Sequence, residues 1–197
     1  MNTKYDLKSI LEKNAGWITL REVEALGISR QEFYRDARHA DLEKAGRGVY
    51  IAPDAWPDSM FLLHLRSSQI VFSHESALFL HGMTEREPLR HFVTVRTGYN
   101  PHRLQEDGIK VYLIKKELYE LGLTQAETSF GHLVPVYDPE RTICDIVRSR
   151  NNVDKQVFQH ALKAYGRRRD KNLRNLMRYS EALQVKKILK PYLEVLL

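Results

Sequence analysis

Residues 73–83, SHESALFLHGM, place two histidines, a glutamate and two serines in one short segment. His74, Glu75 and His81 are residue types that ligate metal ions, and Ser76 between acidic and imidazole neighbours has the surroundings of a nucleophile. However, the seven-residue spacing of the histidines differs from the i, i+4 spacing of an H-E-x-x-H zinc site. No clustered His or Cys supplies a third ligand, and the serine lacks the G-x-S-x-G elbow. The segment therefore predicts a structural element without metal-binding or catalytic function.

A second group of ionisable residues lies in YDPERTICDIVR: Asp138, Glu140, Arg141 and Asp145. Aspartate before Pro139 is typical of a helix start, and the Arg141–Asp145 spacing favours an i, i+4 ion pair. A two-metal nuclease would need a lysine near its carboxylates, and this segment holds none. We therefore interpret Asp138, Arg141 and Asp145 as structural, and His81 likewise, with a nuclease-like site as the alternative.

The helix that contains the two histidines should start at Ser73 and end at Gly82. His81 would then lie in the last helical turn, where the helix dipole favours an imidazolium.

The N-terminal segment contains two helix-start signals in close succession. The sequences TLRE at 19–22 and SRQE at 29–32 are capping boxes. They predict helices over 20–26 and 30–40, and Gly27 stops the first one. Two capped helices separated by a glycine turn indicate a helix-turn-helix.

A β-hairpin is expected directly after these helices. Lys44 and Arg47 bracket a turn that contains Gly46 and Gly48, and VYIA reads as the return strand. WIT at 17–19 predicts a further strand segment. A helix-turn-helix followed by a hairpin is the pattern of a winged helix.

The helix 30–40 would present one face of side chains that bond base edges or phosphates. These side chains are Arg30, Gln31, Tyr34, Arg35 and Arg38. Phe33, Ala37 and Ala40 form the opposite, packing face. Arg47 would enter a minor groove from the tip of the wing, with Lys44 beside it. We expect DNA binding; a protein–protein module with solvated arginines is the alternative.

The prolines and turn-favouring residues of PDAWPDSM predict a domain boundary, which divides the chain into a winged-helix domain, 1–55, and a C-terminal domain, 56–197. A helix is also expected at 5–14. The C-terminal domain should be a mixed α/β domain that ends in several helices, so the fold class is α+β. The expected strands are 69–72, 91–97, 109–114 and 132–137, with a turn-rich loop between the second and third. The expected helices are 58–67, 115–121, 139–149, 153–165, 171–179 and 182–196.

Positive charge is concentrated late in the chain. The net charge is +6. Residues 1–55 hold nine basic and nine acidic residues, whereas 148–190 hold thirteen basic and three acidic residues, a net +10. Such a stretch favours a polyanion or an acidic partner. The candidate residues are Arg148, Arg150, Arg167, Arg168, Arg169, Lys171, Lys186 and Lys187. They would face outward and contact DNA phosphates; a solvated basic surface is the alternative.

The cysteine content and the lack of long apolar runs limit which kinds of protein this can be. One cysteine, Cys144, excludes an internal disulfide framework and a multi-cysteine zinc site. The first residues lack an apolar core of signal-peptide length, and no run reaches the roughly 18 apolar residues that span a bilayer. We expect a cytoplasmic protein with no membrane partner, no metal and no cofactor.

Segments spread over nearly the whole chain resemble one family. They are EVEALGISRQEFYR with GRGVYIAPD, then SHESALFLHGMTE, VYDPERTICDIVR and LQVKKILKPYLEVLL. In order and spacing they resemble the AbiEi antitoxins of type IV toxin–antitoxin systems, which are associated with abortive infection of phage. The resemblance implies a winged helix that represses the operon through inverted repeats in its promoter. It also implies a C-terminal domain that counteracts a cognate nucleotidyltransferase-like toxin. Under this resemblance, the basic residues of 148–190 could instead form the antitoxin surface, acting on the toxin or on its nucleic-acid substrate.

Binding to an inverted repeat requires two copies of the protein on one site. Because the sequence shows no heptad seam, we expect a monomer in solution that pairs on double-stranded promoter DNA. We expect no enzymatic activity. The alternatives are a nuclease-like enzyme targeted by its winged helix, and a plain transcriptional regulator whose C-terminal domain binds a ligand or dimerises.

Overall fold

The computed structural model describes residues 5–196, with the backbone alone for residues 195 and 196. Residues 1–4 and 197, which belong to the two predicted domains, lie outside the described residues. The chain forms two compact units. The first comprises the residues up to Ser67 together with Phe130–His132, and the second comprises Ser68–Ser129 and the residues from Leu133 onward. The first compact unit thus extends twelve residues beyond the predicted boundary at residue 55. The division into a DNA-binding and an antitoxin domain stays a prediction.

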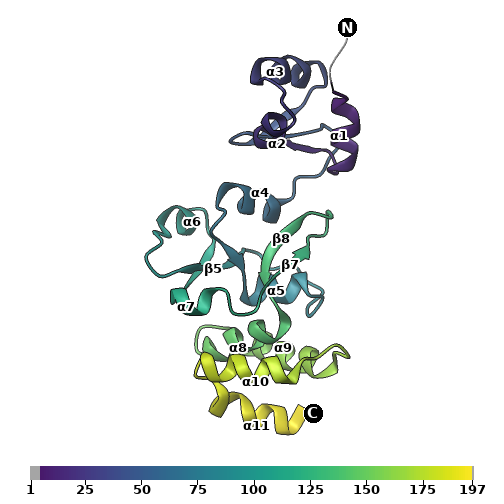
Figure 1. Cartoon of the computed structure of the whole chain (residues 1–197). Coiled ribbons are helices and arrows are strands. Elements are labelled where there is room, and N and C mark those ends of the chain that lie inside the picture. The colour runs from purple at the N-terminus through teal and green to yellow at the C-terminus, as the bar shows by residue number, and fades with distance from the viewer. Residues whose placement is uncertain (1–4, 197) are drawn as a thin grey trace. The chain divides into compact units, whose positions relative to one another are not determined.

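The first unit is a winged helix followed by one additional helix (Figure 1). Its elements are α1 (Leu7–Lys13), β1 (Trp17–Thr19), α2 (Leu20–Ala25), α3 (Arg30–His39), β2 (Glu43–Gly46), β3 (Val49–Ile51) and α4 (Ser59–Arg66). The strands form an antiparallel sheet in the order β1-β3-β2. The predicted winged helix is therefore confirmed.

Two apolar clusters hold the first unit together. Beneath α2 and α3 lie buried side chains that include Ile18, Val23 and Phe33. On the other side of the sheet, Trp17 packs edge-on against Phe61 of α4, with ring centroids 5.7 Å apart. Burial of such aromatic and aliphatic surface is the main stabilising term of a small domain.

The short segment Phe130–His132 returns to this second cluster from far along the chain. The His132 ring stacks on Phe61 with centroids 4.2 Å apart, and it meets Trp17 edge-on. Its Nδ1 lies 2.9 Å from Oδ2 of Asp58, a buried residue that also caps α4. Since His132 and Asp58 are 74 residues apart in sequence, the first unit is not a contiguous piece of the chain.

The second unit combines a five-stranded mixed sheet with a group of helices at one of its ends (Figure 1). Its elements begin with β4 (Val71–Phe72), α5 (His74–Leu80), β5 (Phe92–Arg96), α6 (His102–Glu106), β6 (Lys110–Ile114) and α7 (Lys116–Tyr119). They continue with β7 (Leu123–Glu127), β8 (Leu133–Tyr137), α8 (Pro139–Arg148), α9 (Lys155–Arg167), α10 (Leu173–Ala182) and α11 (Lys186–Leu196). The predicted α+β class, with several helices at the end, is confirmed.

Two elements of the sheet region differ from the sequence-based expectation. The sheet order is β6-β5-β4-β8-β7, in which β5 and β6 run parallel. Parallel neighbours need a crossover rather than a tight turn, and the loop expected between them indeed contains α6. The strand β7, which pairs antiparallel with β8, was not predicted. It is an edge strand with mostly exposed side chains, so its sequence LTQAE lacks the apolar alternation of a buried strand.

The core of the second unit is centred on α8. Eight of its ten residues are buried, from Glu140 to Val147, and α9, α10 and α5 pack around it. Buried residues such as Ile143, Tyr165 and Leu176 form one apolar cluster there. Because α8 is covered on all sides, its charged residues must find partners inside the protein. Within the described part of the chain, no helix has the length and apolarity needed to cross a membrane.

Candidate nucleic-acid interface and buried polar cavities

The start of α3 is fixed by a complete capping box. The Ser29 Oγ accepts the backbone N–H of Glu32 at 3.2 Å, while the Glu32 carboxylate accepts the backbone N–H of Ser29 at the same distance. The same arrangement at Thr19 and Glu22 starts α2. Both predicted capping boxes are confirmed, and they hold the two helices of the helix-turn-helix at defined starts.

The expected polar face of α3 is exposed. All five of its predicted members, Arg30, Gln31, Tyr34, Arg35 and Arg38, lie at the surface. On the opposite face Phe33 and Ala37 are buried, as expected. Ala40 is exposed rather than packed, because α3 ends at His39 and Ala40 is its C-terminal cap. The structure thus places the five polar side chains together on one accessible face.

Acidic neighbours partly neutralise this face. Arg30 Nε lies 2.6 Å from a carboxylate oxygen of Glu24 on α2, and Arg35 Nε lies 3.1 Å from Asp36. Asp36 also accepts a hydrogen bond from the Tyr5 hydroxyl at 2.8 Å, and this bond is the largest contribution that lowers the pKa of Asp36. The Arg30–Glu24 pair is exposed on both sides and therefore weak, so a phosphate or a base can replace its carboxylate, whereas Asp36 is half-buried.

The wing presents its two predicted basic residues on β2 and on the turn after it. Lys44 is exposed on β2, where its Cα is paired with that of Tyr50 on β3. Arg47 is exposed in the turn between the strands. The turn is tight because Gly48 adopts a positive φ of +71°, a conformation in which an added Cβ would be strained. The glycine thus helps to fix Arg47 at the tip.

The second predicted basic surface divides into groups with different surroundings. Arg148, Arg150, Arg167, Arg169, Lys186 and Lys187 are exposed, although Lys186 is paired with Glu181. Arg168 and Lys171 are half-buried instead of facing outward. Arg168 donates to the His81 carbonyl at 2.8 Å and pairs with Asp170, and Lys171 donates to the Gly166 carbonyl at 2.7 Å. These two cations satisfy backbone carbonyls, so they are less available to an external anion.

Two of the remaining cations, Arg148 and Arg167, lie near opposite ends of α8. Arg148 lies at the C-terminal end of α8. The turn that follows Arg167 is held at the N-terminal end of the same helix, because the Asn172 backbone N–H donates to the Glu140 carboxylate at 2.8 Å. Ten residues of helix separate the two ends, about 15 Å.

The segment 73–83 does not bring its ionisable side chains together. His74 and Glu75 line two different cavities. His81 caps α5 and its Nε2 donates to the Tyr137 carbonyl at 2.7 Å. No group of three or more His, Cys, Asp or Glu side chains in the described chain is placed to hold a metal ion.

Ser73 is the N-cap residue of α5, so the helix starts where it was expected, although the Ser73 side chain makes no capping hydrogen bond. Its hydroxyl instead accepts from Thr94 Oγ1 at 2.8 Å and lies 3.1 Å from His74 Nδ1. Burial lowers the pKa of His81, which opposes the expected imidazolium.

The predicted cap and ion pair of α8 are present. Asp138 accepts the backbone N–H of Arg141 at 2.7 Å. Arg141 Nε donates to Asp145 at 3.0 Å, and both residues are buried. The pKa of Asp145 rises to about 6 because burial outweighs the attraction of Arg141. The guanidinium also lies over the Tyr137 ring, 4.1 Å from its centroid.

Sequence reasoning missed one buried carboxylate that connects the helices. Glu140 accepts from the Tyr165 hydroxyl at 3.0 Å as well as from Asn172. It joins α8 to α9 and to the start of α10. No local pattern signals this role, because its partners lie 25 and 32 residues further along the chain.

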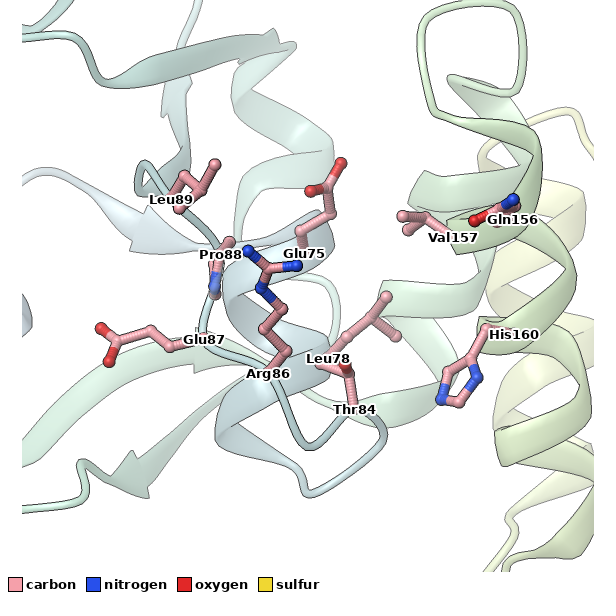
Figure 2. Close-up of a pocket in the computed structure, with 10 residues that line it drawn as sticks. All are labelled: Glu75, Leu78, Thr84, Arg86, Glu87, Pro88, Leu89, Gln156, Val157 and His160. Carbon is pink, nitrogen blue, oxygen red and sulfur yellow. The ribbon is translucent and has the colours of Figure 1, made fainter.

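The larger of the two cavities lies beside α5 and has a volume of about 390 Å³. Figure 2 shows Glu75, Leu78 and the loop from Thr84 to Leu89 on one side, with Gln156, Val157 and His160 of α9 on the other. The smaller cavity, of about 200 Å³, is lined by His74, Thr94, Tyr112, Leu113, Ile114, Arg141, Asp145, Arg148, Ser149 and Asn152. The predicted ion pair of α8 therefore lines a cavity.

The winged-helix part of the chain matches a known family. Residues 5–53 match the model of the family described as transcriptional regulator, AbiEi antitoxin. The match confirms the predicted resemblance over this segment, and it supports an antitoxin-regulator role. The matched family is one of regulators rather than a class of enzymes.

Two further comparisons concern the whole chain. A search of curated protein sequences gave no significant match. The structure is similar to the crystal structure of the RV2827C protein from Mycobacterium tuberculosis, with a TM-score of 0.59 and 15% sequence identity. The similarity covers 93% of this chain and 74% of that one. At this identity it shows a shared fold and nothing about function.

Proposed function

We propose that this protein, whose N-terminal segment matches the AbiEi antitoxin family, is the antitoxin of a type IV toxin–antitoxin phage-defence system. It also represses its own operon by binding inverted repeats in the promoter. The family match over residues 5–53 supports the regulator role. The observation that carries DNA binding is the exposed polar face of α3, built on a capped helix-turn-helix.

The α3 helix would lie in the major groove. Arginine bonds a guanine edge through two parallel hydrogen bonds, and glutamine bonds an adenine edge in the same way. Arg30 and Gln31 occupy the first turn of α3, the part of a recognition helix that typically contacts bases. On binding, Arg30 would leave Glu24 and bond a DNA acceptor instead. A DNA sequence that offers no acceptor at this position would therefore bind more weakly.

The wing would supply a second contact. Arg47 at the tip enters the adjacent minor groove, where a narrow A-tract attracts an arginine, and Lys44 contacts the neighbouring backbone. Two copies would occupy the two halves of an inverted repeat, about 34 Å or one helical turn apart.

The antitoxin activity would reside in the second unit and oppose a nucleotidyltransferase-like toxin. Its exposed cations Arg167, Arg169 and Lys187 are suited to DNA phosphates or to an acidic partner. A phosphate role would add affinity that falls steeply with salt, because each contact releases a bound counterion.

A gel-shift titration of the full chain on its own upstream DNA tests the repressor function. We expect tight binding to that duplex and weak binding to a scrambled duplex of the same length and composition. The Arg35→Ala, Arg47→Ala double variant should lose at least tenfold in affinity for the upstream duplex. Arg103→Ala, which removes an exposed arginine of α6 in the second unit, is the matched control.

Unchanged affinity in the double variant would contradict the assignment of α3 and the wing to DNA. The winged helix would then be a protein-interaction module. Antitoxin activity is tested separately, by co-expressing the chain with the toxin of its operon and measuring growth.

A further inference from the structure

We propose that the smaller cavity of the second unit binds a phosphate-sized oxyanion. This inference goes beyond the proposed function, since it concerns neither the winged helix nor the exposed cations Arg167, Arg169 and Lys187. The cavity has a volume of about 200 Å³, below the roughly 300–1,000 Å³ of typical drug-sized ligand sites. It therefore suits a small group such as phosphate rather than an entire nucleotide.

The cavity has a buried floor and an exposed rim. His74, Thr94, Arg141 and Asp145 at the floor are each less than 5% exposed. Arg148 and Asn152 at the rim are exposed. Polar groups at depth below a cationic rim form a site that a small anion can enter from solvent.

Two buried donors that line the cavity lack a hydrogen-bond partner among the described residues: Nη2 of Arg141 and the hydroxyl of Tyr112. The other guanidinium nitrogens of Arg141 are satisfied, because Nε donates to Asp145 and Nη1 donates to the Leu118 and Leu121 carbonyls. An unsatisfied buried donor is costly, because it has lost its hydrogen bond to water without gaining another one. An oxyanion in the cavity would remove this penalty.

A chain of hydrogen bonds adds a third donor. Thr94 Oγ1 donates to Ser73 Oγ, which lies 3.1 Å from His74 Nδ1, and His74 Nε2 lies 3.0 Å from Ser149 Oγ. Burial keeps the imidazole neutral, with a pKa lowered to about 3. We assign its single proton to Nε2, because the fully buried Ser73 hydroxyl, which does not line the cavity, then has an acceptor for its own proton in Nδ1. Ser149 then accepts from His74, and its own proton is directed to another acceptor.

The charges around the cavity also favour an anion. Asp145 opposes it, but this carboxylate is paired with Arg141 at 3.0 Å. Arg148 at the rim and Lys110 on β6 are further positive charges close enough to lower the pKa of His74. Among the lining residues, Arg148 is one cation in excess of the Arg141–Asp145 ion pair, and the unsatisfied groups are donors rather than acceptors. The cavity is therefore suited to an acceptor-rich, negatively charged ligand.

The backbone at the floor is strained in the way typical of functional sites. His74 is a buried residue with φ of +50°, a conformation that non-glycine residues seldom adopt. Such strained positions cluster at ligand sites. The imidazole lies against Ser73, Ser149 and the Tyr112 ring.

Isothermal titration calorimetry of the full chain with inorganic phosphate, against sodium chloride of the same ionic strength, tests the proposal. We expect saturable binding to the wild type and at least tenfold weaker binding to Arg148→Gln and Tyr112→Phe. Both changes spare the buried ion pair. Arg86→Gln is the matched control, since this exposed arginine lines the larger cavity instead (Figure 2).

A second arm distinguishes free phosphate from a phosphate carried by a larger molecule. A short oligonucleotide is titrated with and without a 5′-phosphate. Saturable binding of inorganic phosphate supports a free oxyanion, and a preference for the 5′-phosphorylated form supports a terminal phosphomonoester. The proposal is overturned if neither phosphate form binds saturably, or if Arg148→Gln binds as well as Arg86→Gln does.

Discussion

The His74 ring lies face to face on the Tyr112 ring, with centroids 3.6 Å apart and planes inclined by 9°. This contact joins the first residue of α5 to β6, on the far side of β5 in the sheet order. Together with the two serine hydroxyls, this contact holds the imidazole of a residue whose backbone has a positive φ. The histidine that first suggested metal chemistry is thus a neutral, buried group.

The pH dependence of stability should show two opposing buried groups. Between about pH 6 and 4.5 the unfolded chain binds an extra proton at His74, because the folded-state pKa is lowered to about 3 from 6.5. In the same window the folded chain binds an extra proton at Asp145, because its pKa is raised to about 6 from 3.8. The two effects nearly cancel in the wild type.

Removing either group should reveal the pH dependence of stability that the other one causes. In Asp145→Asn, the free energy of unfolding should fall with acidification by about 1.4 kcal/mol per pH unit relative to wild type. In His74→Gln it should rise by a similar amount on the same scale. Urea denaturation at pH 6, 5.25 and 4.5 measures both slopes. Parallel pH profiles for all three proteins would contradict this assignment.

A close approach beside Arg141 should make Gly122 intolerant of a side chain. Gly122 has φ of +76°, and an added Cβ would lie 2.6 Å from Cβ of Arg141. Gly108 has nearly the same φ, +78°, but no atom within 4 Å of such a Cβ. Gly122→Ala should therefore lose about 1–3 kcal/mol more stability than Gly108→Ala, as overpacked sites do. Equal losses, measured by urea denaturation, would show that backbone strain alone is responsible.

The capping box of α3 should contribute to stability and to DNA binding together. Ser29→Ala removes the acceptor for the Glu32 backbone N–H and should cost about 1 kcal/mol. Ser29→Thr keeps the hydroxyl, which accepts the Glu32 backbone N–H and donates to the Glu32 carboxylate, and should retain most of the stability. Thermal unfolding and a gel shift of both variants check this expectation. If Ala and Thr behave alike, the cap does not stabilise α3.

The exposed cations Arg167, at the end of α9, and Arg169, in the turn that follows, should act through the salt dependence of DNA affinity. If they contact phosphates, Arg167→Ala with Arg169→Ala should make the plot of log affinity against log salt concentration shallower by about two units. If they oppose the toxin instead, the slope should be unchanged while protection of growth is lost. Gel shifts at several salt concentrations, beside the co-expression assay, separate the two outcomes.

Local signals in the sequence predicted the first unit well. Capping boxes, a glycine stop and a glycine-flanked turn each depend on residues within about four positions of one another. They located α2, α3 and the wing to within a residue or two. The α8 cap and the Arg141–Asp145 pair were predictable for the same reason.

Features that depend on distant partners were not predictable. The edge strand β7 is defined by pairing with β8 rather than by an apolar pattern. Nothing local indicates that Arg168 reaches the carbonyl of His81, 87 residues earlier. The smaller cavity likewise assembles Thr94, Tyr112 and Ser149 from separate elements, so the sequence predicted the residues of α8 but not the cavity that they line.

Cys144, the single cysteine of the sequence, lies fully buried in α8, and burial raises the pKa of its thiol. It can react with a thiol reagent only when the second unit opens. The rate at which the thiol is labelled therefore measures the opening of the second unit, and no engineered probe is needed. Comparing this rate with and without operator DNA shows whether DNA binding by the winged helix changes the stability of the core around α8.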